Sequence, residues 1–376
     1  MEKLMWVRLT IFIVLFGSKV SNIAIAQTTN AAAFPAVFAF GDSIFDTGNN
    51  NNLMTMSKCN FPPYGRDYYG GKATGRFGNG RVLSDLITSA LGVKDTLPAF
   101  LNPSLTSQDL VTGVCFASGG SGFDDMTANA QGAVLTMGQQ LNYFQQYITK
   151  LRGIVGNERA ADIISKALFI ISSGNNDVAF AYSFTPRHFL PFNVYSNMLV
   201  SAGQNFLKSL YQLGARHVWV LSTLPLGCLP AARSTMGGPL RVCVDFENGL
   251  AAQYNNMLQQ GLATVKGSLP DYDIRFVDVY TPMLRLIQNP FQSGFVNVWT
   301  GCCGTGTFEM GPSCNTFTLQ CPSTASYFFW DVAHPTERAY QATLAQVLQT
   351  HNYDLNSYNI SQTLHPFNVS TLSFNY

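Results

Sequence analysis

Short apolar runs alternate along the chain with longer segments in which apolar residues recur at helical spacing. The runs predicted to be strands are residues 37–40, 113–117, 167–172, 218–222 and 274–279. The segments predicted to be helices are residues 81–91, 135–155, 194–213, 245–265 and 335–348. Strands that alternate with helices of this length predict an α/β fold with a parallel sheet and helices on both faces.

Such a sheet directs attention to the polar residues that follow its strands, because open parallel sheets bind ligands at the carboxyl ends of their strands. We find no internal repeat, low-complexity tract or linker in the chain. The sequence therefore predicts a single catalytic domain rather than several domains.

The two chain ends differ in character from this α/β region. Lys3 and Arg8 precede an apolar run at residues 9–16 and small residues ending at Ala26, which is the layout of a secretory signal peptide. The run is too short for a bilayer, which takes about 20 apolar residues. We expect residues 1–26 to be a cleaved signal peptide, residues 27–350 to be the folded domain, and residues 351–376 to be a polar tail.

The composition excludes some classes of function. Of the 376 residues, 47% are hydrophobic and 11% are charged, with a formal net charge of +1, so the chain can bury a large core and is not disordered. Lys and Arg are scattered rather than clustered. Nucleic acid is therefore not expected as a partner, because phosphate binding needs a concentrated basic surface.

Eight cysteines suit a secreted chain, in which disulfides persist. The spacing argues against a zinc site, since no paired C-x-x-C pattern or nearby histidine occurs. Adjacent Cys302 and Cys303 are expected to bond Cys314 and Cys321 in one order or the other, and Cys228 can bond Cys243. Asn359 and Asn368 begin N-glycosylation sequons in the polar tail.

Ser43 is the first candidate for chemistry. It follows the first predicted strand in the segment Phe40-Gly41-Asp42-Ser43, where the glycine lets the chain turn sharply and exposes the serine at the sheet edge. Ser, Asp and Gly are also ordinary residues of turns and helix caps. A partner is therefore needed before Ser43 can be assigned as a nucleophile.

His334 is the histidine best placed to be that partner. Asp331 precedes it by three residues and Pro335 follows it at a predicted helix start. A carboxylate at this spacing can bind Nδ1 and leave Nε2 free to take the serine proton. The alternative is that Asp331 caps the helix and His334 is incidental. The remaining histidines, at positions 188, 217, 351 and 365, are interpreted as structural or solvated.

Acyl transfer also needs hydrogen-bond donors for the developing oxyanion. Residues 117–122 are rich in glycine and follow the second predicted strand, and residues 174–177 (GNND) follow the third. Each segment alone could be a plain turn. Together they place backbone N–H groups and an Asn amide at the same edge of the sheet as Ser43.

These segments resemble the GDSL esterases and lipases, also called SGNH hydrolases, and in particular their secreted plant branch. The matching blocks are residues 40–50 (FGDSIFDTGNN), 113–120 (GVCFASGG), 174–177 (GNND) and 331–335 (DVAHP), with weaker matches at 61–65, 75–80 and 224–228. The blocks occur in the same order across roughly residues 37–348. The resemblance implies a three-layer α/β/α sandwich.

The resemblance also implies residue roles: Ser43 as nucleophile, His334 as base, Asp331 as its orienting group, and Gly119 and Asn176 as oxyanion donors with the Ser43 N–H. No G-x-S-x-G pentapeptide occurs, which separates the chain from typical α/β-hydrolases. One position departs from the family pattern, because Cys115 stands where Asn is usual. We expect this change to tune the support of the nucleophile loop.

The sequence thus predicts a secreted hydrolase of carboxylic esters, such as lipid, cutin-like or cell-wall acyl esters, that forms an acyl-enzyme on Ser43. Two alternatives remain: an acyltransferase that uses the same acyl-enzyme, and a wall-associated binding protein on an inactive scaffold. No metal or organic cofactor is implied, because the sequence contains no ligand cluster or phosphate-binding loop.

Overall fold

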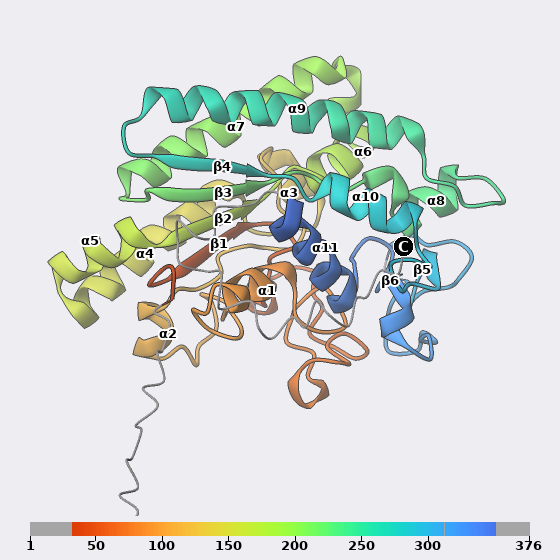
Figure 1. The fold of residues 1–376 in the computed structure, drawn as a ribbon, viewed down its shortest axis with the longest axis horizontal. Coiled ribbons are helices and arrows are strands. Elements are labelled where there is room, and N and C mark those ends of the chain that lie inside the picture. Colours follow the sequence, from red (N-terminus) through yellow and green to blue (C-terminus); the bar gives the residue numbers. More distant parts are fainter. Residues whose placement is uncertain (1–31, 312, 351–376) are drawn as a thin grey trace, which may run out of the picture. The chain divides into compact units, whose positions relative to one another are not determined.

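The strands of the central sheet pair in the order in which they occur along the chain (Figure 1). The computed structural model describes residues 32–311 and 313–350. Its main sheet consists of β1 (Val37–Gly41), β2 (Leu168–Ser172), β3 (His217–Leu221) and β4 (Asp273–Val277), all parallel. Connections between neighbouring parallel strands are right-handed. A sheet whose strands lie in chain order therefore has the helices of these connections on one face.

Helices cover the sheet on both sides. The longer ones are α1 (Leu83–Ala90), α4 (Met137–Val155), α5 (Asn157–Lys166), α7 (Phe192–Gln212), α9 (Asp245–Ser268), α10 (Tyr280–Gln288) and α11 (Glu337–Thr350). Shorter ones are α2 (Ser107–Val111), α3 (Asp125–Ala130), α6 (Tyr182–Phe184) and α8 (Pro230–Met236). α4 and α9 both pack against α7, whereas α1 and α10 pack against α11 on the other side (Figure 1). The result is the expected three-layer α/β/α arrangement.

The strands form a sheet because their side chains are apolar on both faces. Every residue of β1 and β2 is buried, as expected for parallel strands covered by helices. Phe40 of β1 stacks on Phe116 with ring centroids 5.0 Å apart and meets Phe144 of α4 edge-on at 5.7 Å. This aromatic packing fixes β1 and therefore the turn that follows it.

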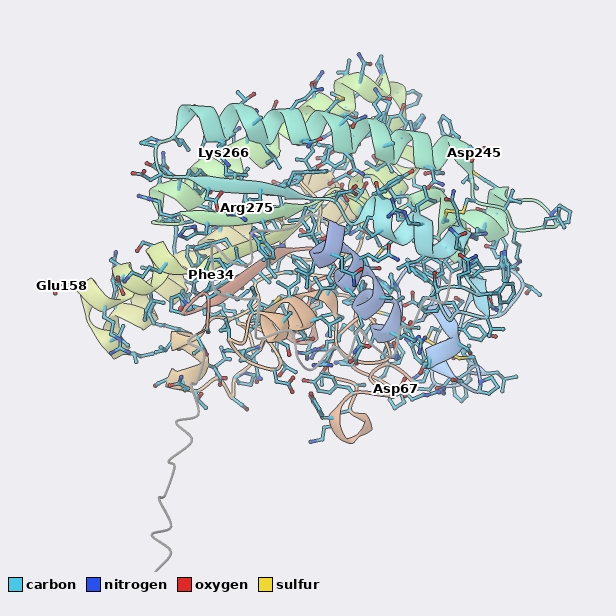
Figure 2. All side chains as sticks on the ribbon, viewed as in Figure 1. Phe34, Asp67, Glu158, Asp245, Lys266 and Arg275 are labelled. Carbon is cyan, nitrogen blue, oxygen red and sulfur yellow. A yellow bond between two sulfur atoms is a disulfide. The ribbon has the colours of Figure 1, made fainter. Side chains whose placement is uncertain are left out.

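Local sequence sets the helix ends. The Thr136 hydroxyl accepts a hydrogen bond from the Gln139 N–H, and the Gln139 side chain accepts from the Thr136 N–H, so a capping box begins α4. α9 carries Asp245 in its first turn and Lys266 in its last (Figure 2). Each charge has the sign that the helix dipole favours at its end.

Most of the predicted elements are present, with ends that differ by a few residues. The exception is the strand predicted at residues 113–117. Its backbone runs beside β1, where the Phe116 N–H donates to the Ala39 carbonyl at 2.7 Å, but its ladder pairing is confined to isolated bridges at Cys115. Gly113 has a φ of 99° and packs against the Val37 backbone, a conformation that a regular strand does not contain.

A small second sheet was not predicted. It pairs β5 (Asn297–Gly301) with β6 (Tyr327–Phe329), and the long loop between these strands contains most of the disulfide bonds. The bonds are Cys302–Cys321, Cys303–Cys314 and Cys228–Cys243, which confirms the expected pairing groups and settles their order. Cys59 and Cys115 are buried free thiols.

Some sequence predictions fall outside the part of the chain that the structure describes. The signal peptide at residues 1–26, the tail at 351–376 and the sequons at Asn359 and Asn368 are among them. Within residues 32–311 and 313–350, no helix has the length and apolar character needed to cross a bilayer.

The disulfide Cys303–Cys314 is expected to stabilise the fold, because it restricts the unfolded state of the loop that it closes. Replacing both cysteines with serine should lower the free energy of unfolding by about 2–4 kcal/mol, measured by urea denaturation. Wild-type protein with all disulfides reduced should lose at least as much. An unchanged denaturation midpoint in the double variant would contradict this prediction.

Candidate active site

The turn after β1 places Ser43 at the carboxyl edge of the sheet. Gly41 ends the strand with a φ of 124°, and a Cβ there would lie 1.7 Å from the Ser172 carbonyl oxygen, so only glycine fits. The side-chain amide of Gln140 accepts from the Gly41 N–H at 2.8 Å and donates to the Gly41 carbonyl at 2.9 Å. Gln140 therefore fixes both the N–H and the carbonyl group of Gly41, two residues before Ser43.

The Asp42 side chain also stabilises this turn through hydrogen bonds. Its buried carboxylate accepts hydrogen bonds from the Ile44 N–H at 3.0 Å, the Asn175 amide at 2.9 Å and the Ser172 hydroxyl at 3.3 Å. Burial raises the pKa of Asp42 to about 6, and the donors together with His334 limit the rise. Asp42 is thus a buried support for the turn, while Ser43 next to it faces the cavity.

Ser43, His334 and Asp331 form a continuous hydrogen-bonded array. His334 Nε2 lies 2.8 Å from Ser43 Oγ, and His334 Nδ1 lies 2.8 Å from both carboxylate oxygens of Asp331. Ser43 and His334 are 291 positions apart, so the fold alone brings them together. The arrangement is that of a nucleophile, a base and a group that orients the base.

The Asp331 carboxylate is held in its ionised form. Burial acts to raise its pKa, but His334 and the backbone N–H groups of Ala333 and His334 bring the pKa below its usual value. Both N–H groups donate to Oδ1, at 2.9 and 2.8 Å. Ala333 and His334 lie in the loop before α11, so Asp331 does not cap that helix. The Thr336 hydroxyl does so instead, by accepting from the Ala339 N–H at 3.2 Å.

The loop with Gly119 differs from the expectation in one detail. The Gly119 N–H donates to Asp46 Oδ2 at 2.9 Å, so this donor is already engaged. Gly120 is the glycine of this loop that lines the cavity beside Ser43. Asp46 also accepts from the N–H groups of Gly48 and Asn49, and burial raises its pKa to about 6 against these donors.

Asn176, which the family resemblance implies as an oxyanion donor, lines the cavity beside Ser43. One N–H of its amide donates to the Ser121 carbonyl at 2.9 Å, which leaves a second N–H for a ligand. Sequence reasoning missed its neighbour Asn175, which donates to Asp42 and accepts from the Leu224 N–H at 2.9 Å. Its place beside Asn176 in the same block is the only sequence feature that could have suggested a role.

Cys115, the departure from the family pattern, lies behind the nucleophile loop. Its thiol is buried and donates to the Phe45 carbonyl at 3.1 Å, and burial raises its pKa to about 12. The Asn49 amide donates to the carbonyls of Cys115 and Ala117 at 2.9 and 2.8 Å. The cysteine thus contacts the loop that contains Ser43 without lining the cavity.

The cavity over Ser43 is largely apolar and has a volume of about 510 Å³. Its apolar walls include Phe77, Phe180, Phe184, Leu224, Leu226 and Met310. Its polar groups are hydroxyls, amides and the His334 imidazole, and none of the described lining residues is Lys, Arg, Asp or Glu. Such a cavity fits an uncharged ligand with an apolar part.

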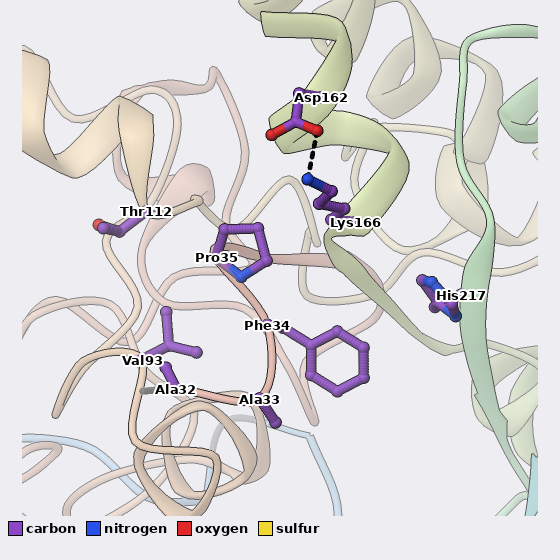
Figure 3. Close-up of a pocket in the computed structure, with 9 residues that line it drawn as sticks. All are labelled: Ala32, Ala33, Phe34, Pro35, Val93, Thr112, Asp162, Lys166 and His217. Atoms are coloured by element: carbon purple, nitrogen blue, oxygen red, sulfur yellow. Dashed lines mark ion pairs between the residues drawn. The ribbon is translucent and has the colours of Figure 1, made fainter. Parts of the chain in front are cut away.

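A second, larger hollow lies at the amino end of the sheet (Figure 3). It has a volume of about 660 Å³ and is lined by Phe34, which precedes β1, and His217, which begins β3. Asp162 and Lys166 form an ion pair at its edge. None of its described lining residues pairs a nucleophile with a base, so the catalytic candidates belong to the smaller cavity. Across the described residues, no His, Cys, Asp and Glu cluster could hold a metal ion.

Comparison with known proteins agrees with this geometry. Residues 37–347 match the family described as GDSL-like Lipase/Acylhydrolase. The chain is 48% identical over 324 residues to GDSL esterase/lipase At1g23500 of Arabidopsis thaliana, covering 86% of this chain and 91% of that protein. It is 46% identical over 326 residues to GDSL esterase/lipase At1g73610 of the same plant, covering 86% and 91%.

The raised pKa of Asp42 predicts a pH-dependent contribution to stability. Between its ordinary value of 3.8 and about 6, the folded chain keeps a proton that the unfolded chain has released. The contribution of Asp42 to the free energy of unfolding therefore falls as pH rises through this window, by at most about 3 kcal/mol. Urea denaturation at a series of pH values should show a smaller decline for Asp42→Asn than for the wild type.

The comparison of these two proteins isolates Asp42, because the other buried carboxyl groups are the same in both. Parallel stability curves for wild type and Asp42→Asn between pH 4 and 7 would contradict the predicted contribution.

Proposed function

We propose that this chain, which belongs to the GDSL-like lipase/acylhydrolase family and is a hydrolase that acts on ester bonds, forms an acyl-enzyme on Ser43. The observation that carries the proposal is the array in which His334 Nε2 lies 2.8 Å from Ser43 Oγ at the wall of an apolar cavity. Asp331 supports the role of His334 as base because it binds Nδ1 and fixes the tautomer.

In the first step, Ser43 Oγ forms a bond to the acyl carbon while His334 Nε2 takes its proton. The carbonyl oxygen becomes an oxyanion, and when the tetrahedral intermediate collapses, the leaving alcohol receives that proton from His334. In the second step, water loses a proton to His334 and attacks the acyl carbon. The acid product leaves, and Ser43 regains its proton.

The proposed oxyanion donors are the Ser43 N–H, the second N–H of the Asn176 amide and an N–H of the 119–120 loop. Gly119 can serve only if its N–H leaves Asp46. Gly120 lines the cavity and its N–H has no partner among the described residues, which favours it as the donor from this loop. Donors fixed before the reaction stabilise the oxyanion without reorganisation.

The cavity supports a substrate whose acyl part is apolar and uncharged. The buried side chains of Leu224 and Leu226 form part of the cavity wall. Phe184 and Met310 also line the cavity but are partly exposed to solvent. Lipid, cutin-like and phenolic or other cell-wall acyl esters all fit this description. An apolar wall contributes binding in proportion to the apolar area that the ligand buries against it.

Secretion is part of the proposal. The signal-peptide pattern of residues 1–26 and the disulfides at Cys228, Cys302 and Cys303 support an oxidising compartment. We propose that Asn359 and Asn368 carry glycans in the secreted protein.

Two other functions use the same scaffold. In an acyltransferase, an alcohol other than water would take the acyl group from Ser43, and product analysis with competing alcohols separates the two reactions. In a wall-associated binding protein, the array would be unused. The 2.8 Å contact between Ser43 and His334 favours an active enzyme, because binding alone does not need it.

Replacing Ser43 with alanine should reduce turnover of p-nitrophenyl esters by more than about a thousandfold, because the covalent route is lost. The fold should be retained, since the mutation removes one hydroxyl from a cavity wall. Ser173→Ala is the matched control: Ser173 is buried at the carboxyl end of β2 and its hydroxyl has no partner among the described residues. Hydrolysis is measured by release of p-nitrophenol. Equal activity in Ser43→Ala and wild type would refute the assignment.

A further inference from the structure

The Asp331 carboxylate has a partner that the proposed mechanism does not use. The Tyr64 hydroxyl donates to Asp331 Oδ2 at 2.8 Å, across 267 positions of sequence. The backbone N–H groups of Ala333 and His334 bind the other oxygen, Oδ1. Tyr64 and the His334 imidazole therefore both bind the second oxygen of the carboxylate, and Tyr64 holds it from outside the array.

We propose that Tyr64 is a positioning residue that acts through Asp331, holding the carboxylate in the orientation in which it directs His334 toward Ser43. The inference rests on the proposed function, because it assumes that His334 is the base. Tyr64 itself does not touch the reacting atoms in this assignment.

The surroundings of Tyr64 suit a fixed hydrogen bond. The residue is 8% exposed and Asp331 is 2% exposed, so water competes little for either group. The Tyr64 ring meets Trp330 edge-on with centroids 6.2 Å apart and Phe61 edge-on at 5.5 Å. These contacts hold the phenol against the residue that precedes Asp331, so its oxygen has little freedom to move.

The protonation state of the phenol also suits a donor. Burial raises the pKa of Tyr64 well above its ordinary value, and the nearby Asp331 and Cys59 raise it further. The phenol therefore keeps its proton throughout the pH range of enzyme assays. A protonated phenol beside an ionised carboxylate gives a charge-assisted hydrogen bond, which is stronger than a neutral one.

Loss of this donor has two distinct consequences for the array. Asp331 becomes freer to rotate, so His334 is less often directed toward Ser43. The carboxylate charge is also less neutralised, so it stabilises the His334 imidazolium more strongly. The first effect lowers kcat, and the second moves the acid limb of the rate profile to higher pH.

A second buried tyrosine provides a matched control. Tyr340 on α11 is fully buried near Asp42 and Asp331, and its hydroxyl has no hydrogen-bond partner among the described residues. Tyr340→Phe deletes a buried hydroxyl in the same region without removing a bond to the array. A general effect of losing a buried hydroxyl would appear in both variants.

The test compares wild type, Tyr64→Phe, Tyr340→Phe and Ser43→Ala with p-nitrophenyl esters across pH. For Tyr64→Phe we expect kcat to fall about tenfold with KM changed by less than about twofold, and the acid limb to move to higher pH. Tyr340→Phe should match the wild type in all three. An unchanged kcat and pH profile in Tyr64→Phe, or equal effects in both tyrosine variants, would overturn the inference.

Two further measurements test the inference, and the first keeps the Tyr64 hydroxyl, so it applies even if Tyr64→Phe does not fold. Site-specific 3-fluorotyrosine at position 64 keeps the ring and hydroxyl but makes the phenol a stronger donor, so the acid limb should move to lower pH. In the Asp331→Asn background, removing the Tyr64 hydroxyl should have no further effect on kcat. An unmoved limb, or a full additional loss in that background, would indicate a packing role only.

The Ser43→Ala variant separates failure of this inference from failure of the proposed function. If Ser43→Ala is as active as wild type, the proposed function is wrong, and the inference about Tyr64 is refuted with it. If Ser43→Ala is inactive and Tyr64→Phe equals wild type, only the role of Tyr64 is refuted.

Discussion

The hydrogen bond between Ser43 Oγ and His334 Nε2 connects the two segments that form the candidate active site. It is 2.8 Å long and joins the turn after β1 to the loop before α11. Each side of it is held by buried groups: Gln140 holds the backbone at Gly41, and Tyr64 with backbone N–H groups holds Asp331. The sheet and its helices fix the distance between the Ser43 and His334 side chains, and a displacement of about 1 Å would greatly weaken the proposed proton transfer between them.

Buried carboxylates near the site stabilise its loops, and their pKa values differ with their surroundings. Asp42, Asp46 and Asp177 bind N–H and O–H donors, and burial raises their pKa values to about 6, 6 and 7. Asp331 instead faces the His334 imidazole, and its pKa is lowered. Unlike these three groups, Asp331 is held as a negative charge, as its proposed role of orienting His334 requires.

Sequence reasoning predicted the parts of the fold that depend on local patterns. Strand and helix periodicity located the central sheet, and the spacing of Asp331 and His334 indicated a hydrogen-bonded pair. Contacts between distant segments were beyond its reach: nothing in a helical glutamine such as Gln140 indicates that it binds Gly41, 99 positions away. The same limit applies to Tyr64 and to the Gly119 N–H, whose partner Asp46 is known only once the loops are placed side by side.

A serine nucleophile activated by a histidine reacts covalently with a fluorophosphonate, so labelling of the folded protein tests the proposed roles of Ser43 and His334. Mass spectrometry of peptides from the folded, labelled protein should locate one adduct, on Ser43, and the labelling rate should fall sharply in a His334→Ala variant. An adduct on another residue, or no adduct on the folded protein, would show that Ser43 is not the nucleophile.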